Sequence, residues 1–473
     1  MNDGGPEDVA DVVVVGGGPG GCAAALEAAR RGGSVILVEA GDRVGGNAAR
    51  STGYLAFQDF AMQHETAITD SAAAFMADME AEIELQRERY GLIFDVDLAR
   101  LFAEESSATY DFLTDLGFRF NRFIQRPKQH TVDRMIDVAD TAMFTTLFEP
   151  ALADAGVDVR AHTRAGRLLT HDNGVVGVDT AAGPIQAKKG VVLAAGGYQA
   201  NPELRARYQP ASMADTPYLG TEHDRGDGHL MGQAVGGDLI NMTMIPPLIM
   251  VGSALVEESI AVNRSGRRFH DEAGPYDDRV AALGQQPDKL AWYVFDDRTA
   301  RRKGQLVDEM PDDPATAPSL EELAGKIGCD PAGLVAAVRD WNETVSSAAE
   351  RDPAFGRVIF PNPRCGIIEA PFHASRMVVG INFPAGGFRV TTDTQVIDVF
   401  GRPIPGLFAV GDCVGGISPT IGLGGMKISA ALTLGRIAGR VIATDNVGDH
   451  ATAGLTGAPA LPANSMRIAV VDE

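Results

Sequence analysis

The chain has 473 residues, which is enough for two or three domains of ordinary size. It carries 41 Lys+Arg against 63 Asp+Glu, so its formal net charge is −22. An acidic chain without a long basic stretch is a poor candidate for binding nucleic acid or anionic membrane. Gly, Pro or charged residues interrupt the apolar runs well short of the roughly 20 residues that a membrane span needs. The acidic first residues lead directly into an expected strand, so we expect no signal peptide.

The four cysteines, Cys22, Cys329, Cys365 and Cys413, include no C-x-x-C pair. This spacing argues against a disulfide framework, a zinc site or a protein-bound iron–sulfur cluster, so we expect no metal and a reducing, cytoplasmic location. Glycine is enriched, with 55 residues. The glycines gather beside apolar runs, which indicates close approaches of the backbone rather than linkers.

The first informative segment, residues 12–39, has the pattern of strand, helix and second strand. Val12–Val15 lead into Gly16-x-Gly18-x-x-Gly21, an alanine-rich stretch follows, and a second β run closes on Glu39. In such a unit the first glycine permits a tight turn, the second admits a pyrophosphate, and the third allows close packing of helix on strand. The helix N-terminus suits phosphates, and the acid can accept hydrogen bonds from a ribose. The segment therefore predicts a dinucleotide site.

Later segments decide between NAD and FAD. No second glycine fingerprint follows a strand in the way that a separate nicotinamide domain would require. Instead the chain has a strand with paired glycines at residues 191–198, which includes Gly196. Near the C-terminus a strand ends at Asp412, and a glycine-rich turn leads into an alanine-rich helix after Gly425. Two such segments at opposite ends of the chain suit one long cofactor, so FAD is the natural candidate.

An ordered set of motifs now becomes recognisable: GGGPGG…VILVEA, GGN, VVLAAGG, GDGHLMGQAVGG, VNRSGRRFHDE, GLFAVGD and LGG…GRIAGR. Their order and spacing resemble the fumarate reductase/succinate dehydrogenase flavoprotein superfamily, which includes the ketosteroid dehydrogenases. The resemblance implies an α/β, Rossmann-like FAD-binding domain built from residues 1–242 and 371–473. It also implies an inserted α+β capping domain, residues 243–370, with the active site where the cap meets the flavin.

The resemblance assigns FAD-binding roles as well. The first glycine loop and Glu39 would bind the ADP half of FAD, and Asp412 would bind the ribityl chain. The GGN segment and the C-terminal glycine pair would lie along the pyrophosphate and the flavin ring. The full set is Gly16, Gly18, Gly21, Glu39, Gly46, Asn47, Gly196, Asp412, Gly424 and Gly425. Asp412 could instead be a helix N-cap. Because GGNAARSTGYLA has no histidine, where covalent members carry one, we expect the FAD to be noncovalent.

The dicarboxylate enzymes of this superfamily hold substrate carboxylates with histidine and arginine side chains. The matching substrate-site positions here are Asn382 and Phe383, Gly422, Thr243 and Tyr276. All of them lack the charge that a dicarboxylate needs, and burying an unpaired carboxylate costs several kcal/mol. The sequence therefore disfavours fumarate and succinate.

The segment RRFHDEAGPYDD resembles the cap motif of ketosteroid dehydrogenases at Pro275-Tyr276. The resemblance implies desaturation of a ketone or cyclic carbonyl compound: a tyrosine base takes the proton next to the carbonyl, and a hydride leaves for flavin N5. Electrons would then pass to oxygen or an external acceptor. Tyr276 is the candidate base, with Arg279 and His270 able to help it. Packing of this tyrosine inside the cap is the structural alternative.

Basic residues gather between Arg122 and Arg134, a segment that includes Arg126, Lys128 and His130. Arg126 and His130 could bind or act on a substrate carbonyl or carboxylate, and a solvated basic loop is the other interpretation.

Two further functions stay open. One is a reductase of an activated double bond with Arg279 as the proton donor, and the other is a non-catalytic FAD-binding redox carrier. The substrate, the acceptor and the oligomeric state have no signal in the sequence.

Overall fold

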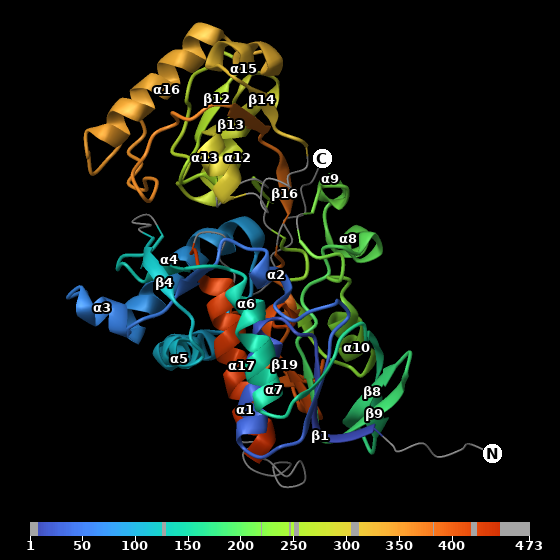
Figure 1. The fold of residues 1–473 in the computed structure, drawn as a ribbon. Helices are drawn as coiled ribbons and strands as arrows, with labels where there is room; N and C mark the ends of the chain where they lie inside the picture. Colours follow the sequence, from blue (N-terminus) through green and yellow to red (C-terminus); the bar gives the residue numbers. More distant parts are fainter. Residues whose placement is uncertain are drawn as a thin grey trace.

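A computed structural model describes residues 8–124, 129–218, 220–245, 247–249, 255–303, 312–381, 383–417 and 423–444. Figure 1 shows two lobes: a larger one built from both ends of the chain and a smaller one built from its middle, coloured yellow to orange. The larger lobe is an α/β domain around a parallel sheet, and the smaller lobe is the inserted cap. The fold class predicted from the sequence is therefore confirmed.

The central sheet of the larger lobe has the strand order β18-β19-β9-β1-β2-β6. Its core strands are parallel, whereas β18 is antiparallel to β19, and β7 and β8 form an antiparallel extension beside β9. The strands are β1 (Asp8–Val15), β2 (Val35–Val38), β6 (Asp158–Arg160), β7 (Ala165–His171), β8 (Gly174–Thr180), β9 (Gly183–Leu193), β18 (Gln395–Ile397) and β19 (Pro403–Ala409).

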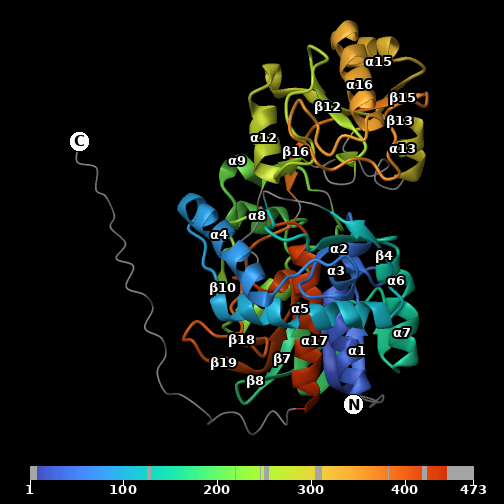
Figure 2. The same cartoon turned by 90° about the vertical axis from the view of Figure 1, so that its left-hand side faces the viewer.

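The helices of this lobe cover the sheet and extend beside it (Figures 1 and 2). They are α1 (Pro19–Arg30), α2 (Gly46–Ala49), α3 (Ala61–Glu65), α4 (Ala72–Tyr90), α5 (Val96–Asp115), α6 (Met143–Thr146), α7 (Phe148–Asp154), α8 (Pro202–Tyr208), α9 (Ala211–Ala214), α10 (Asp227–Ala234) and α17 (Met426–Thr444). A short 3-10 turn, η2 (Gly411–Cys413), follows β19.

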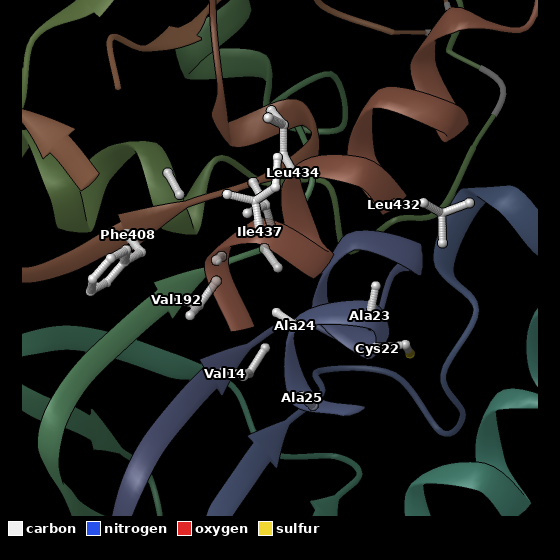
Figure 3. Close-up of a cluster of buried hydrophobic side chains, with 14 of the residues drawn as sticks. Val14, Cys22, Ala23, Ala24, Ala25, Val192, Phe408, Leu432, Leu434 and Ile437 are labelled. Atoms are coloured by element: carbon white, nitrogen blue, oxygen red, sulfur yellow. The ribbon is translucent and has the colours of Figure 1, made fainter. Parts of the chain in front are cut away.

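The core of the larger lobe lies where α1 and α17 pack on the sheet. Figure 3 shows Val14 and Val192 of the strands beside Ala24 of α1 and Ile437 of α17. The two helices approach closely because α17 carries a glycine at the crossing: a Cβ built on Gly435 would lie 2.2 Å from the carbonyl oxygen of Gly20. The helices α1 and α17 therefore pack tightly on each other. This contact joins the N-terminal and C-terminal parts of the domain.

Two smaller sheets complete the larger lobe. One has the order β3-β5-β4, and the other pairs β10 with β17. Their bounds are β3 (Tyr54–Ala56), β4 (Phe120–Phe123), β5 (Met135–Val138), β10 (Leu239–Ile240) and β17 (Gly387–Phe388). Gly425 packs directly on β3, since a Cβ there would lie 2.7 Å from the carbonyl carbon of Leu55. The sheet of β3 thus supports the turn that leads into α17.

The cap is a four-stranded antiparallel sheet in the order β12-β13-β15-β14 with helices on both faces. Trp292 and Val294 of β13 point to one apolar cluster, and Tyr293 and Phe295 point to another, as alternation along a strand requires. The elements are β12 (Ile260–Asn263), α12 (Tyr276–Gly284), η1 (Pro287–Lys289), β13 (Ala291–Asp296), α13 (Asp297–Arg302), β14 (Ala315–Ala317), α15 (Leu320–Ile327), α16 (Pro331–Ser346) and β15 (Phe372–Arg376).

One further strand of the cap sheet lies near the return of the chain to the larger lobe. The strand β15 begins at Phe372 and pairs with β13, so it belongs to the cap sheet. Beyond it β16 (Val379–Ile381) pairs antiparallel with β11 (Pro247–Ile249), and this pair forms the connection between the lobes (Figure 2).

Among the described residues no helix is long and apolar enough to cross a membrane, and no cluster of potential metal ligands occurs. All four cysteines are free thiols. The cytoplasmic location expected from the sequence stays a prediction.

Candidate functional site

A cavity of about 920 Å³ lies at the carboxyl ends of the parallel strands, where open α/β sheets bind their ligands. Its wall is formed by the glycine loop after β1, by α2, by the residues that follow β9 and β19, and by the start of α17. The positions that the sequence predicts for cofactor binding all line this cavity: Gly16, Gly18, Gly21, Glu39, Gly46, Asn47, Gly196, Asp412, Gly424 and Gly425.

Three glycines of the first loop have distinct environments. A Cβ on Gly16, which has φ +105°, would lie 2.3 Å from the carbonyl oxygen of Ala194, and a Cβ on Gly21 would lie 2.0 Å from that of Gly16. These two positions allow the chain to turn and α1 to pack closely. A Cβ on Gly18 would meet nothing within 4 Å, because this residue faces the cavity. The loop therefore forms a cradle that fits the pyrophosphate of a dinucleotide.

Glu39 follows β2 and lies on the same wall. Its carboxylate accepts hydrogen bonds from the backbone N–H groups of Gly17 and Gly41, each at 2.6 Å. These two contacts hold the acid between the glycine loop and the end of the strand. An acid fixed at this point suits the hydroxyl groups of an adenosine ribose.

A buried acid that the sequence analysis missed, Asp224, also lines the cavity. Asn47 Nδ2 donates to its Oδ2 at 2.6 Å, and Tyr218 Oη donates to the same oxygen at 2.5 Å. Burial raises the pKa of Asp224 to about 7, and the nearby carboxylates of Asp412 and Glu39 act in the same direction. The one available signal was the GDG motif that begins two residues after it.

The other end of the cavity is formed by Gly424 and Gly425. Gln129 Oε1 accepts a hydrogen bond from the N–H of Gly424 at 3.2 Å, and His130 Nε2 lies 3.0 Å from its carbonyl oxygen. Burial and the Arg134 cation lower the pKa of His130 to about 4, so its ring is neutral near pH 7. His130 does not itself line the cavity; it lies behind the glycine pair and supports it.

The basic segment between Arg122 and Arg134 divides into several environments. Arg134 is fully buried and pairs with Asp70 at 2.8 Å and with Asp78, so it is part of the packed domain. Arg126 and Lys128 lie outside the described residues. Arg122 forms an ion pair that crosses to the cap.

Tyr54 and Glu257 join the two lobes beside the cavity. Tyr54, which lines the cavity, donates from its hydroxyl to Glu257 of the cap, and Arg122 Nη2 donates to the other oxygen of that carboxylate at 2.6 Å. The two lobes also share an apolar cluster, in which Tyr54 and Met135 of the larger lobe pack with Ala273 and Ile359 of the cap. The sequence analysis did not find Tyr54 or Glu257.

Lys427, the second residue of α17, is a cation on the cavity wall. Its Nζ lies 3.4 Å from Asp412 Oδ1, donates to the carbonyl oxygen of Pro384, and lies 5.4 Å from the ring centroid of Phe383. Phe383, predicted at the substrate site, also lines the cavity. Among the other positions predicted for substrate binding, Asn382, Gly422 and Arg126 lie outside the described residues.

The candidate catalytic residues of the cap lie around the start of α12. This helix begins at Tyr276, whose side chain falls outside the described part of the structure. Arg279 is buried within the cap and does not line the cavity. Burial lowers the pKa of His270 to about 4, and the neighbouring arginines add to this effect. His270 is therefore neutral near pH 7 and supplies no positive charge to a neighbouring tyrosine.

The fold and this cavity define a dinucleotide-binding protein in which one long cofactor crosses one domain. Residues 11–428 match the family described as the FAD binding domain. The chain belongs to this family, and its cofactor is FAD.

The chain is similar to the probable fumarate reductase Ifc3 of Shewanella frigidimarina, with 30% identity over 447 residues that cover 88% of this chain and 71% of that protein. It is also similar to the 4-oxocyclohex-2-ene-1-carboxylate 5-dehydrogenase of Sinomonas cyclohexanicum, with 32% identity over 354 residues, 63% of this chain and 59% of that protein. Among solved structures, the open conformation of a flavocytochrome c3 fumarate reductase has a TM-score of 0.72 at 30% identity and covers 93% of this chain and 79% of that one.

These similarities confirm the resemblance to the fumarate reductase/succinate dehydrogenase flavoprotein superfamily. The chain is an FAD-dependent oxidoreductase.

Proposed function

We propose that this protein desaturates a ketone or cyclic carbonyl compound at the carbons next to its carbonyl and passes the electrons to oxygen or another external acceptor. One observation carries the proposal: Ala273 packs in one apolar cluster with Tyr54 and Met135. Tyr54 lines the FAD cavity, and a Cβ on Gly424 would lie 2.5 Å from Met135 Sδ. The cap motif Pro275-Tyr276 begins two residues after Ala273. The motif therefore starts next to the apolar cluster that includes Met135, the neighbour of Gly424.

Tyr276 is the proposed base. It removes the proton from the carbon next to the carbonyl, while bound FAD supplies the acceptor for the hydride that leaves the neighbouring carbon. A free tyrosine has a pKa of about 10, so this residue needs a partner that accepts its proton or lowers its pKa. The relative that acts on an oxocyclohexene carboxylate supports a substrate of this class.

We further propose that the FAD is held without a covalent bond. The test is denaturation of the protein, which should release the flavin.

The substrate class is tested by anaerobic bleaching of the bound flavin. The panel comprises cyclohexanone, 4-oxocyclohex-2-ene-1-carboxylate, a 3-oxosteroid and succinate. We expect one or more of the carbonyl compounds to bleach the flavin and succinate to leave it oxidised. Bleaching by succinate at a rate equal to that of the best ketone would contradict the argument from the missing charges.

A second candidate function is reduction of an activated double bond. The similarity to a fumarate reductase over 88% of this chain favours it, and Arg279 would be its proton donor. Because Arg279 is buried within the cap, this function requires the arginine to reach the cavity through a change in the cap. Rapid reoxidation of photoreduced enzyme by an enoate, without bleaching by any saturated ketone, would favour the reductase.

A further inference from the structure

The surroundings of Lys427 disfavour a positively charged side chain. It is in the first turn of α17, where the helix dipole disfavours a cation. Its side chain is only 21% exposed, and burial lowers its pKa, although Asp412 opposes this effect. A neutral side chain such as glutamine could also donate to the Pro384 carbonyl, so the packing of this turn does not by itself account for a charge.

The position of Lys427 relates it to the cofactor rather than to the fold. It lines the same cavity as Asp412, Gly424 and Gly425, and it follows the glycine pair by two residues. Asp412 is the carboxylate within 4 Å of its ammonium among the described residues. Lys427, paired with Asp412, is therefore a cation on the cavity wall next to the glycine pair.

We propose that the Lys427 ammonium sets the reduction potential of bound FAD. A hydride brings two electrons and one proton, so its transfer adds one negative charge to the flavin ring system. A cation that is mostly buried interacts with such a charge more strongly than a cation in bulk water does. Lys427 thereby favours the reduced flavin and makes the protein a stronger oxidant of its substrate. This inference depends on FAD binding and holds whether or not the protein desaturates a ketone.

The test is the midpoint potential of the FAD-loaded protein, measured against a reference dye during anaerobic reduction. For Lys427→Met and Lys427→Gln we expect the equilibrium constant for reduction to fall at least tenfold, which is about 30 mV for a two-electron couple. Lys427→Arg keeps the charge and should stay within threefold of the wild type. Lys188→Met, at a lysine of β9 that does not line the cavity, is the matched control and should leave the potential unchanged.

Three outcomes would overturn the proposal. The potential could be the same in Lys427→Met, Lys427→Gln and the wild type, or Lys427→Arg could lower it as much as Lys427→Met does. Loss of FAD from both neutral variants would instead show that Lys427 retains the cofactor rather than tuning it. The absorbance ratio of flavin to protein separates this last case before any titration begins.

Discussion

At Gly18 the backbone itself forms part of the wall of the FAD cavity. A valine at this position would project into open space in the cavity without disturbing its neighbours, since a Cβ there meets nothing within 4 Å. We expect Gly18→Val to fold normally and to lower FAD affinity at least tenfold, as measured by flavin retention on dialysis. Gly325→Ala in α15 is the control. It also adds a Cβ in open space, but Gly325 belongs to the cap and does not line the cavity. Equal retention in both variants would contradict the assignment of the cradle.

Tyr276 is the residue on which the proposed chemistry depends. Removing a general base typically costs 10²–10⁴-fold in rate, so we expect Tyr276→Phe to slow anaerobic bleaching by the best ketone at least a hundredfold and to leave FAD content unchanged. Tyr208→Phe, at a tyrosine of α8 that packs edge to face against Tyr198, is the control. If bleaching by Tyr276→Phe proceeds at the wild-type rate, another residue is the base.

At the residue scale, the sequence predicted the parts of the site whose partners are close along the chain. Gly16, Gly18, Gly21 and Glu39 belong to one βαβ unit, so their spacing alone indicates their arrangement. Tyr54 and Glu257 are 203 residues apart, and a contact of that kind has no local pattern. Asp224 was missed for the same reason, since its hydrogen-bond partner Asn47 is 177 residues away in the chain.

The cap contains a buried ion cluster around Glu272. Its carboxylate is paired with Arg268 at 2.7 Å and with Arg357 at 3.1 Å, and the guanidinium carbons of both arginines lie within 5.1 Å of the ring centroid of Trp341. Burial alone would raise the pKa of Glu272, but its two arginine partners lower it to about 2. The cluster ties the segment before α12 to α16 and thereby supports the start of α12.

We expect Glu272→Gln to destabilise the cap by about 3–5 kcal/mol, because it removes the carboxylate that pairs with buried Arg357 and leaves Arg268 with Asp352 alone. Both tryptophans of the chain, Trp292 and Trp341, are in the cap, so urea unfolding followed by tryptophan fluorescence reports on it. Glu343→Gln on the exposed face of α16 should change stability by less than about 0.5 kcal/mol.

The same variant has an expected pH dependence. Because the folded pKa of Glu272 lies below its unfolded value, the stabilisation is complete above about pH 4.5 and is lost as the pH falls toward 2. The difference between wild type and Glu272→Gln should therefore shrink in acid. A difference that stays constant from pH 6 to pH 3 would show that the carboxylate charge is not the cause.

At the scale of the whole molecule, Glu257 joins the cap to the FAD-binding domain through Tyr54 and Arg122. We expect Glu257→Gln to loosen this contact, since the ion pair with Arg122 is lost. Iodide should then quench the fluorescence of bound flavin more strongly than in the wild type. Arg301→Gln removes ion pairs that lie within the cap and is the control; equal quenching in both variants would argue against a joining role.

The organisation of the molecule was largely predictable because its strand–glycine–helix segments lie at both ends of the chain. A strand from the C-terminal part, β19, pairs with β9 in the central sheet, so the cap that lies between them in the chain is an insertion into a domain built from both ends. The strand β15 was not predictable, because it is short and has the mixed composition FHASR without apolar alternation. Its membership in the cap sheet depends on pairing with β13, which no local pattern indicates.

The most direct measurement of the central claim is the identity of the product after anaerobic single turnover of the FAD-loaded protein with 4-oxocyclohex-2-ene-1-carboxylate and cyclohexanone. We predict that the flavin is bleached by at least one of them and that mass spectrometry finds a product lighter by two hydrogens, with the new double bond next to the carbonyl. A flavin that stays oxidised with every carbonyl compound tested, while photoreduced enzyme is reoxidised by fumarate, would contradict this account.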